Sequence, residues 1–232
     1  MNNGQEEQLL QNLSKVQNLI ESLSLSNKIK PKLLVVSKKQ SVAAMRMIYN
    51  AGMNEFAESF MQEATEKIPQ LPTDISWHYI GRLQSNKIKK IAQYFHWVHT
   101  LSSIYYAEKL QVNCAEFNKN IQVLIQVNVD LEVQKVGIML TDRNKIELLV
   151  SYIIKHCPNL QLKGLMCILK VTGKYDKELA SFQKLAECKD KINQQFMLNL
   201  QQLSMGMSND MPSAINAGST MLRVGTTIFG DR

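Results

Sequence analysis

Eight short apolar runs recur along the chain, and this repetition constrains the fold more than any other feature of the sequence. The runs cover residues 33–38, 54–58, 77–81, 97–100, 121–129, 160–168, 200–206 and 220–225. Between them lie longer stretches with apolar residues at helical spacing, most clearly residues 42–50, 61–68, 104–118, 144–156 and 177–194. Strands that alternate with helices in this way indicate βαβ units and a parallel sheet.

Eight such strands can form either an open doubly wound sheet or a closed barrel. Neither GxGxxG nor GxxxxGK[ST], the phosphate-binding fingerprints of many open sheets, occurs in the sequence. A closed (β/α)8 barrel accounts for the number of runs and for the length of 232 residues together. We therefore expect an α/β fold consisting of a single (β/α)8 barrel.

An additional amphipathic helix is predicted before the first run. The apolar residues that recur there at helical spacing are Leu9, Leu10, Leu13, Val16, Ile20 and Leu23. We expect residues 1–28 to form a helix that packs on a barrel formed by residues 29–232. The same segment has early acidic residues, no apolar core and no arginine, so it resembles neither a secretory signal nor a transit peptide. No stretch approaches 18 uninterrupted apolar residues, and we expect no membrane contact.

Charge and cysteine content narrow the partners and the compartment. Lys and Arg number 27 against 20 Asp and Glu, and the net charge of +7 favours anionic partners. Basic residues are not interleaved with aromatic ones, so we expect no nucleic acid. Four cysteines without a CxxC pair indicate reduced thiols in a cytoplasmic protein. His96 and His99 do not share one face of a strand, and we expect no metal site.

Polar and small residues lie at the ends of the first, seventh and eighth runs. Lys38 ends the first run, Ser208 follows the seventh, and Arg223, Gly225 and Thr226 end the eighth. In a closed barrel the first strand is the neighbour of the last, and functional groups gather at the C-terminal ends of the strands. Small residues and hydroxyls in the last two loops can bind a phosphate group. Such a phosphate would lie beside Lys38.

Lys38 leaves the apolar run LLVV and is expected to be partly desolvated. Desolvation lowers the pKa of an amine and frees it to attack a carbonyl group. A phosphate-bearing aldehyde suits both the amine and the phosphate loops, and pyridoxal 5′-phosphate (PLP) is such a compound. Proteins that use PLP pair a lysine with a phosphate site and with a side chain at the pyridine nitrogen, a role for which Arg223 is placed. A solvated charge is the other reading of Lys38, and the residues alone leave it open.

Several longer segments resemble one known family, the pyridoxal phosphate homeostasis proteins. These segments are LLVVSKKQSVAAMR, AGMNEFAESFMQEA, WHYIGRLQSNKIK, IQVNVDLEVQKVGI, GLMCI and LSMGMSNDMPSAINAGSTMLRVGTTIFGDR. The resemblance covers nearly the whole chain. It implies a PLP-binding barrel similar to the N-terminal domain of alanine racemase. It also implies that Lys38, rather than its neighbour Lys39, forms a Schiff base with PLP.

The resemblance also assigns the remaining contacts. Ser208, Gly225 and Thr226 match the phosphate contacts of the family, and Arg223 matches its contact with the pyridine nitrogen. Where the family usually reads F-G-E-N, this chain has Phe-Ala-Glu-Ser at residues 56–59. Ser59 therefore replaces an asparagine that commonly lies near the cofactor ring, and its side chain has a shorter reach.

Two further residues are candidates at the mouth of the barrel. His78, early in the third run, is expected either to contact the cofactor or to be a packed core histidine. Lys135 matches a lysine of the family pattern, and either a position at the cofactor or a structural role is open to it.

Two functions are compatible with this site. One is a protein that stores or delivers PLP without substrate turnover, with apo forms of PLP-dependent enzymes and other B6 vitamers as partners. The other is a PLP-dependent amino-acid racemase. Racemases of this fold type carry a second, β-rich domain, and a two-base racemase needs an acid or base on each side of the substrate carbon. The sequence stops at Arg232, soon after the eighth run, so we expect a monomeric carrier rather than an enzyme.

Overall fold

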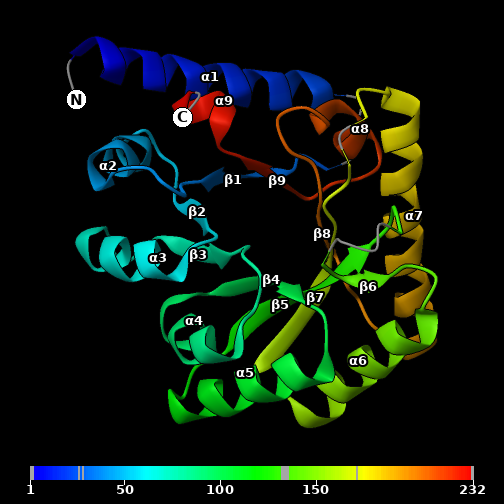
Figure 1. The fold of residues 1–232 in the computed structure, drawn as a ribbon. Coiled ribbons are helices and arrows are strands. Elements are labelled where there is room, and N and C mark those ends of the chain that lie inside the picture. Colours follow the sequence, from blue (N-terminus) through cyan, green and yellow to red (C-terminus); the bar gives the residue numbers. More distant parts are fainter. Residues whose placement is uncertain (1–2, 26, 28, 132–135, 171, 231–232) are drawn as a thin grey trace.

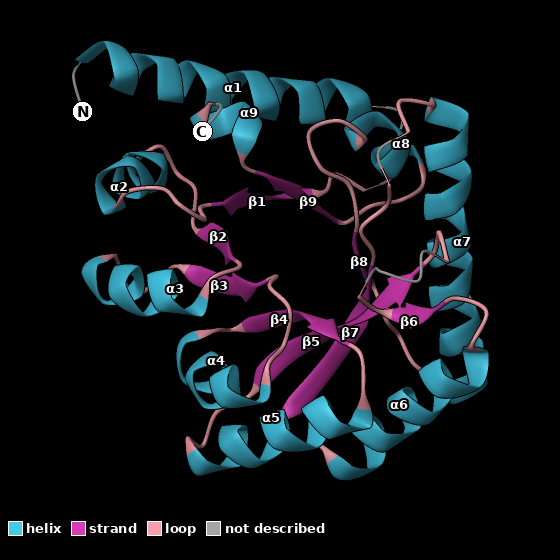
Figure 2. Ribbon diagram, viewed as in Figure 1, coloured by secondary structure: helices cyan, strands magenta, loops and turns pink. Residues whose placement is uncertain are grey.

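Eight parallel strands close into a barrel in the computed structural model, which describes residues 3–25, 27, 29–131, 136–170 and 172–230. The strands of the ring are β1 (Lys32–Val36), β2 (Glu55–Glu58), β3 (Ser76–Tyr79), β4 (Trp97–Leu101), β5 (Ile121–Asn128), β7 (Leu160–Met166), β8 (Gln202–Ser204) and β9 (Met221–Val224). The first strand pairs with β9 and β4 pairs with β5, so the ring has no open edge (Figure 2). The predicted (β/α)8 barrel is confirmed.

Helices surround the ring of strands (Figure 1). They are α2 (Val42–Asn50), α3 (Met61–Lys67), α4 (Ile88–Tyr94), α5 (Ile104–Glu116), α6 (Arg143–His156), α7 (Tyr175–Phe196), α8 (Met211–Asn216) and α9 (Thr226–Phe229), with short 3-10 turns at Ile68–Gln70 and Ser85–Lys87. Side-chain oxygens of Ser41, Ser103 and Asp142 accept hydrogen bonds from first-turn amides of α2, α5 and α6. Helices α2, α3, α5, α6 and α7 agree with the five predicted stretches to within a few residues.

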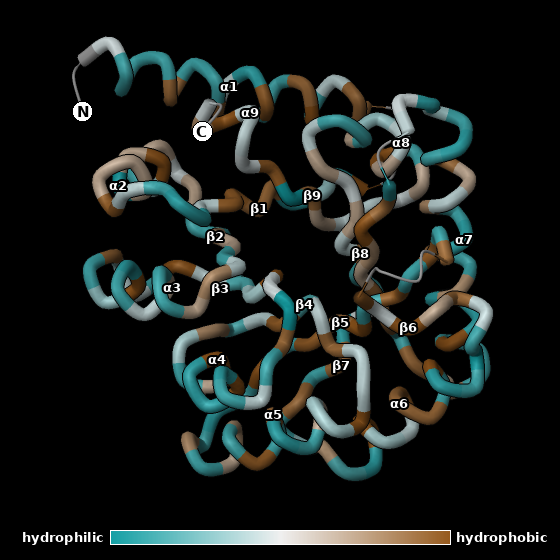
Figure 3. Tube along the Cα trace, viewed as in Figure 1, coloured by the Kyte–Doolittle hydropathy of each residue, from teal (hydrophilic) through white to brown (hydrophobic). Residues whose placement is uncertain are grey.

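Side chains of the strands point alternately into the barrel and outward to the helices. A small cluster fills the interior and consists of Leu34, Val36, Ala57, Trp97, Leu124, Met166 and Met221. A larger core lies between the strands and the helices. Apolar residues accordingly follow the strands and the helix sides that face them (Figure 3). Because both faces of the strands are buried, their sequences are nearly continuous apolar runs.

The first helix, α1 (Asn3–Ser24), packs on the barrel against α2, α8 and α9 (Figure 1). Its buried apolar side chains are Leu9, Leu13, Val16 and Ile20, which belong to the same core as the barrel helices. The side-chain amide of Asn12 donates to the carbonyl oxygen of Ile228 over 3.2 Å and joins α1 to α9. The predicted extra helix is therefore present, and the division at residue 28 stays a prediction.

A two-residue strand, β6 (Ile138–Met139), pairs with the end of β5 outside the ring. The sequence did not predict this strand, because two residues are too few to show a period.

As the sequence predicts, the cysteines are reduced: Cys114, Cys157 and Cys167 are buried, Cys188 is half-buried, and none of the four is in a disulfide. Across the described residues, no helix has both the length and the apolar character needed to span a membrane.

Candidate functional site

A cavity of about 500 Å³ lies at the C-terminal ends of the barrel strands. Six predicted site residues line it, namely Lys38, Ser59, Ser208, Arg223, Gly225 and Thr226. A larger groove of about 910 Å³ between α6 and α7 contains none of the predicted residues. The cavity at the barrel mouth is therefore the candidate site.

Lys38 lies in the turn between β1 and α2, and the residues on both sides of it are held by carboxylates. The hydroxyl of Ser37 donates to Glu58 Oε1 over 2.8 Å. The backbone N–H of Lys39 donates to Glu63 Oε2 over 2.6 Å. Lys39 has a φ of 62°, an unfavourable value for a residue other than glycine. The Glu63 carboxylate stabilises this conformation and so fixes the direction in which the chain carries Lys38.

Lys67 of α3 connects the two carboxylates. Its ammonium group donates to Glu58 Oε1 over 3.1 Å, to Glu63 Oε2 over 2.7 Å and to the carbonyl oxygen of Ser37 over 3.0 Å. Burial raises the pKa of Glu58, and the charge of Lys67 and the Ser37 hydrogen bond oppose that increase. A buried ion cluster thus lies directly beneath the turn that carries Lys38.

Small and hydroxyl-bearing residues line the opposite side of the cavity. Gly225 precedes α9, whose first two residues are Thr226 and Thr227. The first N–H groups of a helix have no acceptor within the helix, and they favour anions. The loop that carries Ser208 is held in place by Asp210, which accepts a hydrogen bond from the N–H of Met207 over 2.6 Å. This donor set fits a phosphate group.

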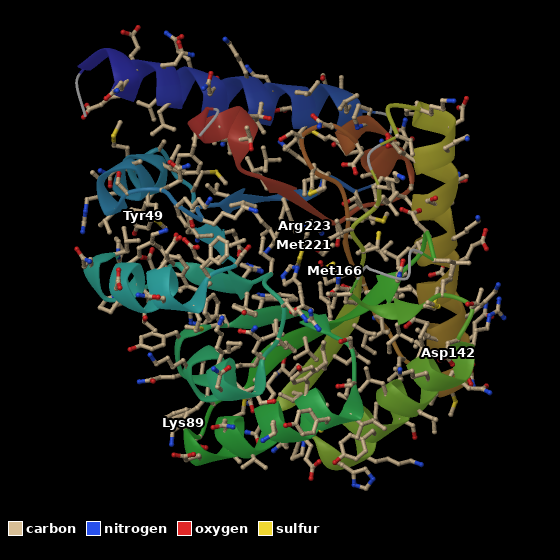
Figure 4. All side chains as sticks on the ribbon, in the orientation of Figure 1. Tyr49, Lys89, Asp142, Met166, Met221 and Arg223 are labelled. Atoms are coloured by element: carbon tan, nitrogen blue, oxygen red, sulfur yellow. The ribbon has the colours of Figure 1, made fainter. Side chains whose placement is uncertain are left out.

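Arg223 of β9 is buried in the barrel and borders the cavity. Figure 4 shows its side chain inside the ring of strands together with Met166 and Met221, whereas Tyr49 lies outside the ring. One terminal nitrogen of the guanidinium donates to Ser204 Oγ over 2.7 Å, and the other donates to the carbonyl oxygen of Cys167 over 2.8 Å. Two anchored nitrogens fix the plane of the guanidinium group.

His78 is not among the described residues that line the cavity. It is buried in the barrel interior, where its Nε2 lies 2.6 Å from Glu55 Oε2 and its Nδ1 lies 2.9 Å from His99 Nε2. His99 Nδ1 in turn lies 2.9 Å from Ser204 Oγ, the group that also binds Arg223. His78 is therefore linked to the cavity through two other residues.

The sequence pattern did not single out Glu55, His99 and Ser204 as parts of a site. Each is a polar residue within or at the start of a strand with buried neighbours, and that was the available signal. Lys135, which matches the family pattern, lies outside the described residues.

The barrel mouth also holds a second, smaller cavity of about 170 Å³. It shares Ile80 and Ile168 with the first cavity and adds Arg82, Thr100, Gln126 and Val136. Together the two cavities border most of the barrel strands at this end.

Burial keeps the interior histidines neutral. It lowers the pKa of His99 well below the usual value, and the neighbouring His78 and Arg223 act in the same direction. Burial also lowers the pKa of His78, although the hydrogen bond to Glu55 opposes this effect. Burial alone would raise the pKa of Glu55, but hydrogen bonds from His78 and Lys32 outweigh it and lower that pKa to about 2. The interior therefore pairs a carboxylate with two uncharged imidazoles.

This state predicts a pH dependence of stability. A histidine that is neutral in the folded protein protonates in the unfolded chain below a pH of about 6.5, so the free energy of unfolding falls as the pH drops. The fully buried His99 contributes up to about 2 kcal/mol to the decrease between pH 7.5 and pH 5, the limit set by an ordinary imidazole pKa in the unfolded chain. We expect His99→Gln to reduce the decrease by that amount in urea unfolding curves recorded across this range.

The buried carboxyl groups of Glu58 and Asp210, whose pKa values are raised, act in the opposite direction. They are the same in both proteins, so their contributions cancel in the difference between the two pH profiles. Parallel profiles for wild type and His99→Gln would contradict a neutral His99.

The fold and the site together define a class, a closed (β/α)8 barrel with an amine, a buried guanidinium and a loop of small and hydroxyl-bearing residues at its mouth. A family model described as the N-terminal domain of alanine racemase matches residues 6–232. A pyridoxal phosphate homeostasis protein of Vibrio alginolyticus is 42% identical over 205 residues, which is 86% of each chain. Its counterpart in Haemophilus influenzae is 38% identical over 230 residues, 95% of this chain and 94% of that one. The chain belongs to the family of pyridoxal phosphate homeostasis proteins, built on the alanine racemase N-terminal type of barrel.

Solved structures show the same architecture. PipY of Synechococcus elongatus PCC7942, with PLP bound, is 30% identical, has a TM-score of 0.82, and is matched over 96% of this chain and 100% of that chain. An alanine racemase of Clostridium difficile 630 has a TM-score of 0.75 at 15% identity and is matched over 97% of this chain and 57% of that chain. The second likeness shows the common fold alone.

Proposed function

We propose that the protein binds PLP at the mouth of the barrel and stores or delivers it without turning over a substrate. The observation that carries this proposal is the meeting of Lys38, Arg223 and the Ser208 loop around one cavity. PLP supplies an aldehyde that reacts reversibly with amines, and it carries a phosphate group. The amine, the phosphate loops and the anchored guanidinium match these groups. The PLP found in PipY supports the same ligand.

The residues divide the binding among them. The Lys38 amine would bond to the aldehyde carbon with release of water, and Ser208, Gly225 and Thr226 would hold the phosphate group. Arg223 donates a hydrogen bond to the pyridine nitrogen. Because Arg223 stays protonated and offers only donors, it keeps that nitrogen in its unprotonated, accepting form and makes the cofactor a weaker electron sink. Ser59 lies on the cavity wall, where it would face the ring of the ligand with a shorter reach than asparagine.

The second candidate function is a racemase, which the fold shared with alanine racemase brings into consideration. A two-base racemase needs a proton donor or acceptor on each face of the substrate carbon. Among the described residues that line the cavity, the titratable side chains are Lys38 and Arg223. An arginine remains protonated and is a poor base. This composition supports a carrier over a two-base enzyme.

Transfer of the cofactor tests the proposal. The protein is loaded with PLP, separated from unbound PLP by gel filtration, and mixed with the apo form of a PLP-dependent aminotransferase. We expect the aminotransferase to regain activity in proportion to the PLP carried. No recovery, under conditions where the same amount of free PLP restores activity, would contradict delivery.

Incubation with single L-amino acids separates the two functions. Chiral analysis is expected to show no accumulation of the D-isomer beyond the rate with free PLP. Sustained turnover at about 1 s⁻¹ or faster, within the usual range of enzymes, would establish a racemase instead.

We also propose that the recipients are apo PLP-dependent enzymes in the cytoplasm, that other B6 vitamers are bound as well, and that the carrier is monomeric. The four cysteines, none of which is in a disulfide, support a reducing compartment. Light scattering of the protein with and without PLP measures its mass, and a stable dimer would contradict the monomer.

A further inference from the structure

A chain of hydrogen bonds crosses the barrel interior from its N-terminal end to the candidate cavity. It begins at Glu55, the first residue of β2, and runs through His78, His99 and Ser204 to Arg223. Every donor-to-acceptor distance in it lies between 2.6 and 2.9 Å. The residues come from β2, β3, β4, β8 and β9, so the chain joins opposite sides of the ring. It connects a carboxylate near solvent to the guanidinium at the cavity.

The chemistry of the end groups sets the direction of each bond. An ionised Glu55 can only accept, so His78 donates from Nε2. A neutral His78 then accepts at Nδ1, and His99 must donate from its own Nε2. His99 accepts at Nδ1 from the hydroxyl of Ser204, whose oxygen keeps a lone pair for the Arg223 N–H. One arrangement of hydrogens thus satisfies the whole chain.

We propose that Glu55 is a positioning residue for Arg223, acting through His78, His99 and Ser204. As a group that only accepts, Glu55 forces Ser204 to donate to His99 and to present its oxygen to the guanidinium. This role of Glu55 rests on the proposed function only in the measurement that uses PLP as the probe.

The reversed arrangement shows what the carboxylate prevents. If His99 carried its hydrogen on Nδ1, it would donate to Ser204, which already accepts from Arg223. The Ser204 hydrogen would then lose its acceptor in a fully buried position, which folded proteins rarely tolerate. Arg223 would have to share the oxygen that anchors it.

Glu55→Gln is a sharp test because it keeps the shape of the side chain and changes its hydrogen-bonding character. A glutamine amide can accept from His78 through its oxygen or donate to His78 through its nitrogen. Both directions of the chain become possible with both imidazoles neutral. Lys32→Met is the matched control. Lys32 donates to the other oxygen of Glu55 over 2.8 Å, so its replacement leaves the bond between Glu55 and His78 in place.

The first measurement uses the full chain without PLP. Histidine ¹H–¹⁵N spectra at pH 7 are expected to show only the Nε2–H form of His78 and His99 in wild type and Lys32→Met. In Glu55→Gln, a second population with Nδ1–H is expected at both histidines. The Arg223 guanidinium resonances, separate in wild type because rotation is hindered, are expected to average in Glu55→Gln.

The second measurement uses PLP as the probe. Glu55→Gln is expected to bind PLP about three- to tenfold more weakly than wild type, the effect of loosening one charge-assisted hydrogen bond, and Lys32→Met is expected to bind normally. A single tautomer and hindered Arg223 resonances in Glu55→Gln would overturn the proposal, as would an Nδ1–H form of His99 in wild type. If wild type takes up no PLP, the proposed function fails, and the spectra without PLP still decide the role of Glu55.

A pair of substitutions at the middle of the chain covers the case in which Glu55→Gln does not fold. His99→Gln keeps one donor for His78 and one acceptor for Ser204, whereas His99→Leu removes both. Separate Arg223 resonances in His99→Gln and averaged resonances in His99→Leu would support the proposed role of the hydrogen-bond chain. Separate resonances in both variants would overturn it.

Discussion

Replacing Lys38 with alanine is expected to abolish the covalent attachment of PLP to the protein. Borohydride reduction of the PLP-loaded protein should fix the cofactor to a single lysine, identified by peptide mass analysis. In wild type we expect that lysine to be Lys38, which lines the cavity, and in Lys38→Ala no peptide should carry the label. The yellow absorbance band of the loaded protein should disappear in the same variant.

Lys39→Ala provides the matched comparison, because Lys39 is adjacent in sequence and its side chain is exposed. Its backbone N–H still reaches Glu63 after the substitution, so the turn is retained. We expect Lys39→Ala to keep both the label on Lys38 and the absorbance band. A label on Lys39 in wild type would show that the assignment of the reactive amine is wrong.

Removing Lys67 is expected to have the largest effect on stability. Lys67→Met leaves Glu58 without its counter-ion at a position where its side chain is 0% exposed. Breaking a buried ion pair by deleting one partner typically costs about 3–5 kcal/mol, because the remaining charge stays buried. Urea unfolding followed by tryptophan fluorescence measures the loss.

Two variants separate charge imbalance from lost packing. Glu58→Gln combined with Lys67→Met removes both charges and is expected to be more stable than Lys67→Met alone. Lys89→Met breaks the exposed pair with Glu116 and should have little effect, since exposed ion pairs contribute little. If Lys67→Met were as mild as Lys89→Met, the buried ion cluster would not stabilise the fold.

We expect the same cluster to link the stability of the protein to the binding of PLP. Ser37 and Lys39, on either side of Lys38, are held by Glu58 and Glu63, and Lys67 holds those carboxylates in turn. A variant that disturbs the cluster therefore also loosens the turn that presents the amine. Loss of stability and slower uptake of PLP should accompany each other in these substitutions.

Much of the fold could be predicted from periodicity because the strands are buried on both faces and the longer helices on one. The helix at Val42–Asn50 was predicted with its observed bounds, and Ser41, its N-cap, precedes the first apolar position. The shortest elements could not be predicted in this way. Strand β6 has two residues and helix α9 has four, too few for a repeat of either 2.0 or 3.6 residues to appear.

The candidate site was predictable to the extent that it depends on strand ends. Closure of the barrel makes β1 the neighbour of β9, and this single topological fact brings Lys38 near Arg223 and Gly225. His78 marks where such reasoning stops. Strand alternation shows that its side chain faces inward. It does not show that the imidazole lies within hydrogen-bond distance of Glu55 and His99, or that His78 is not among the residues that line the cavity.

The sequence by itself determined the alternation of strands and helices, and with it the barrel and the placement of an amine and small residues at one rim. Only the tertiary structure decided which polar side chains meet inside. His99 and Ser204 are 105 residues apart, and their contact depends on the stagger of strands around the closed ring. Local periodicity specifies the face on which a side chain lies. Its position along the barrel axis, and therefore the residue that it meets on another strand, is set by the packing of the whole barrel.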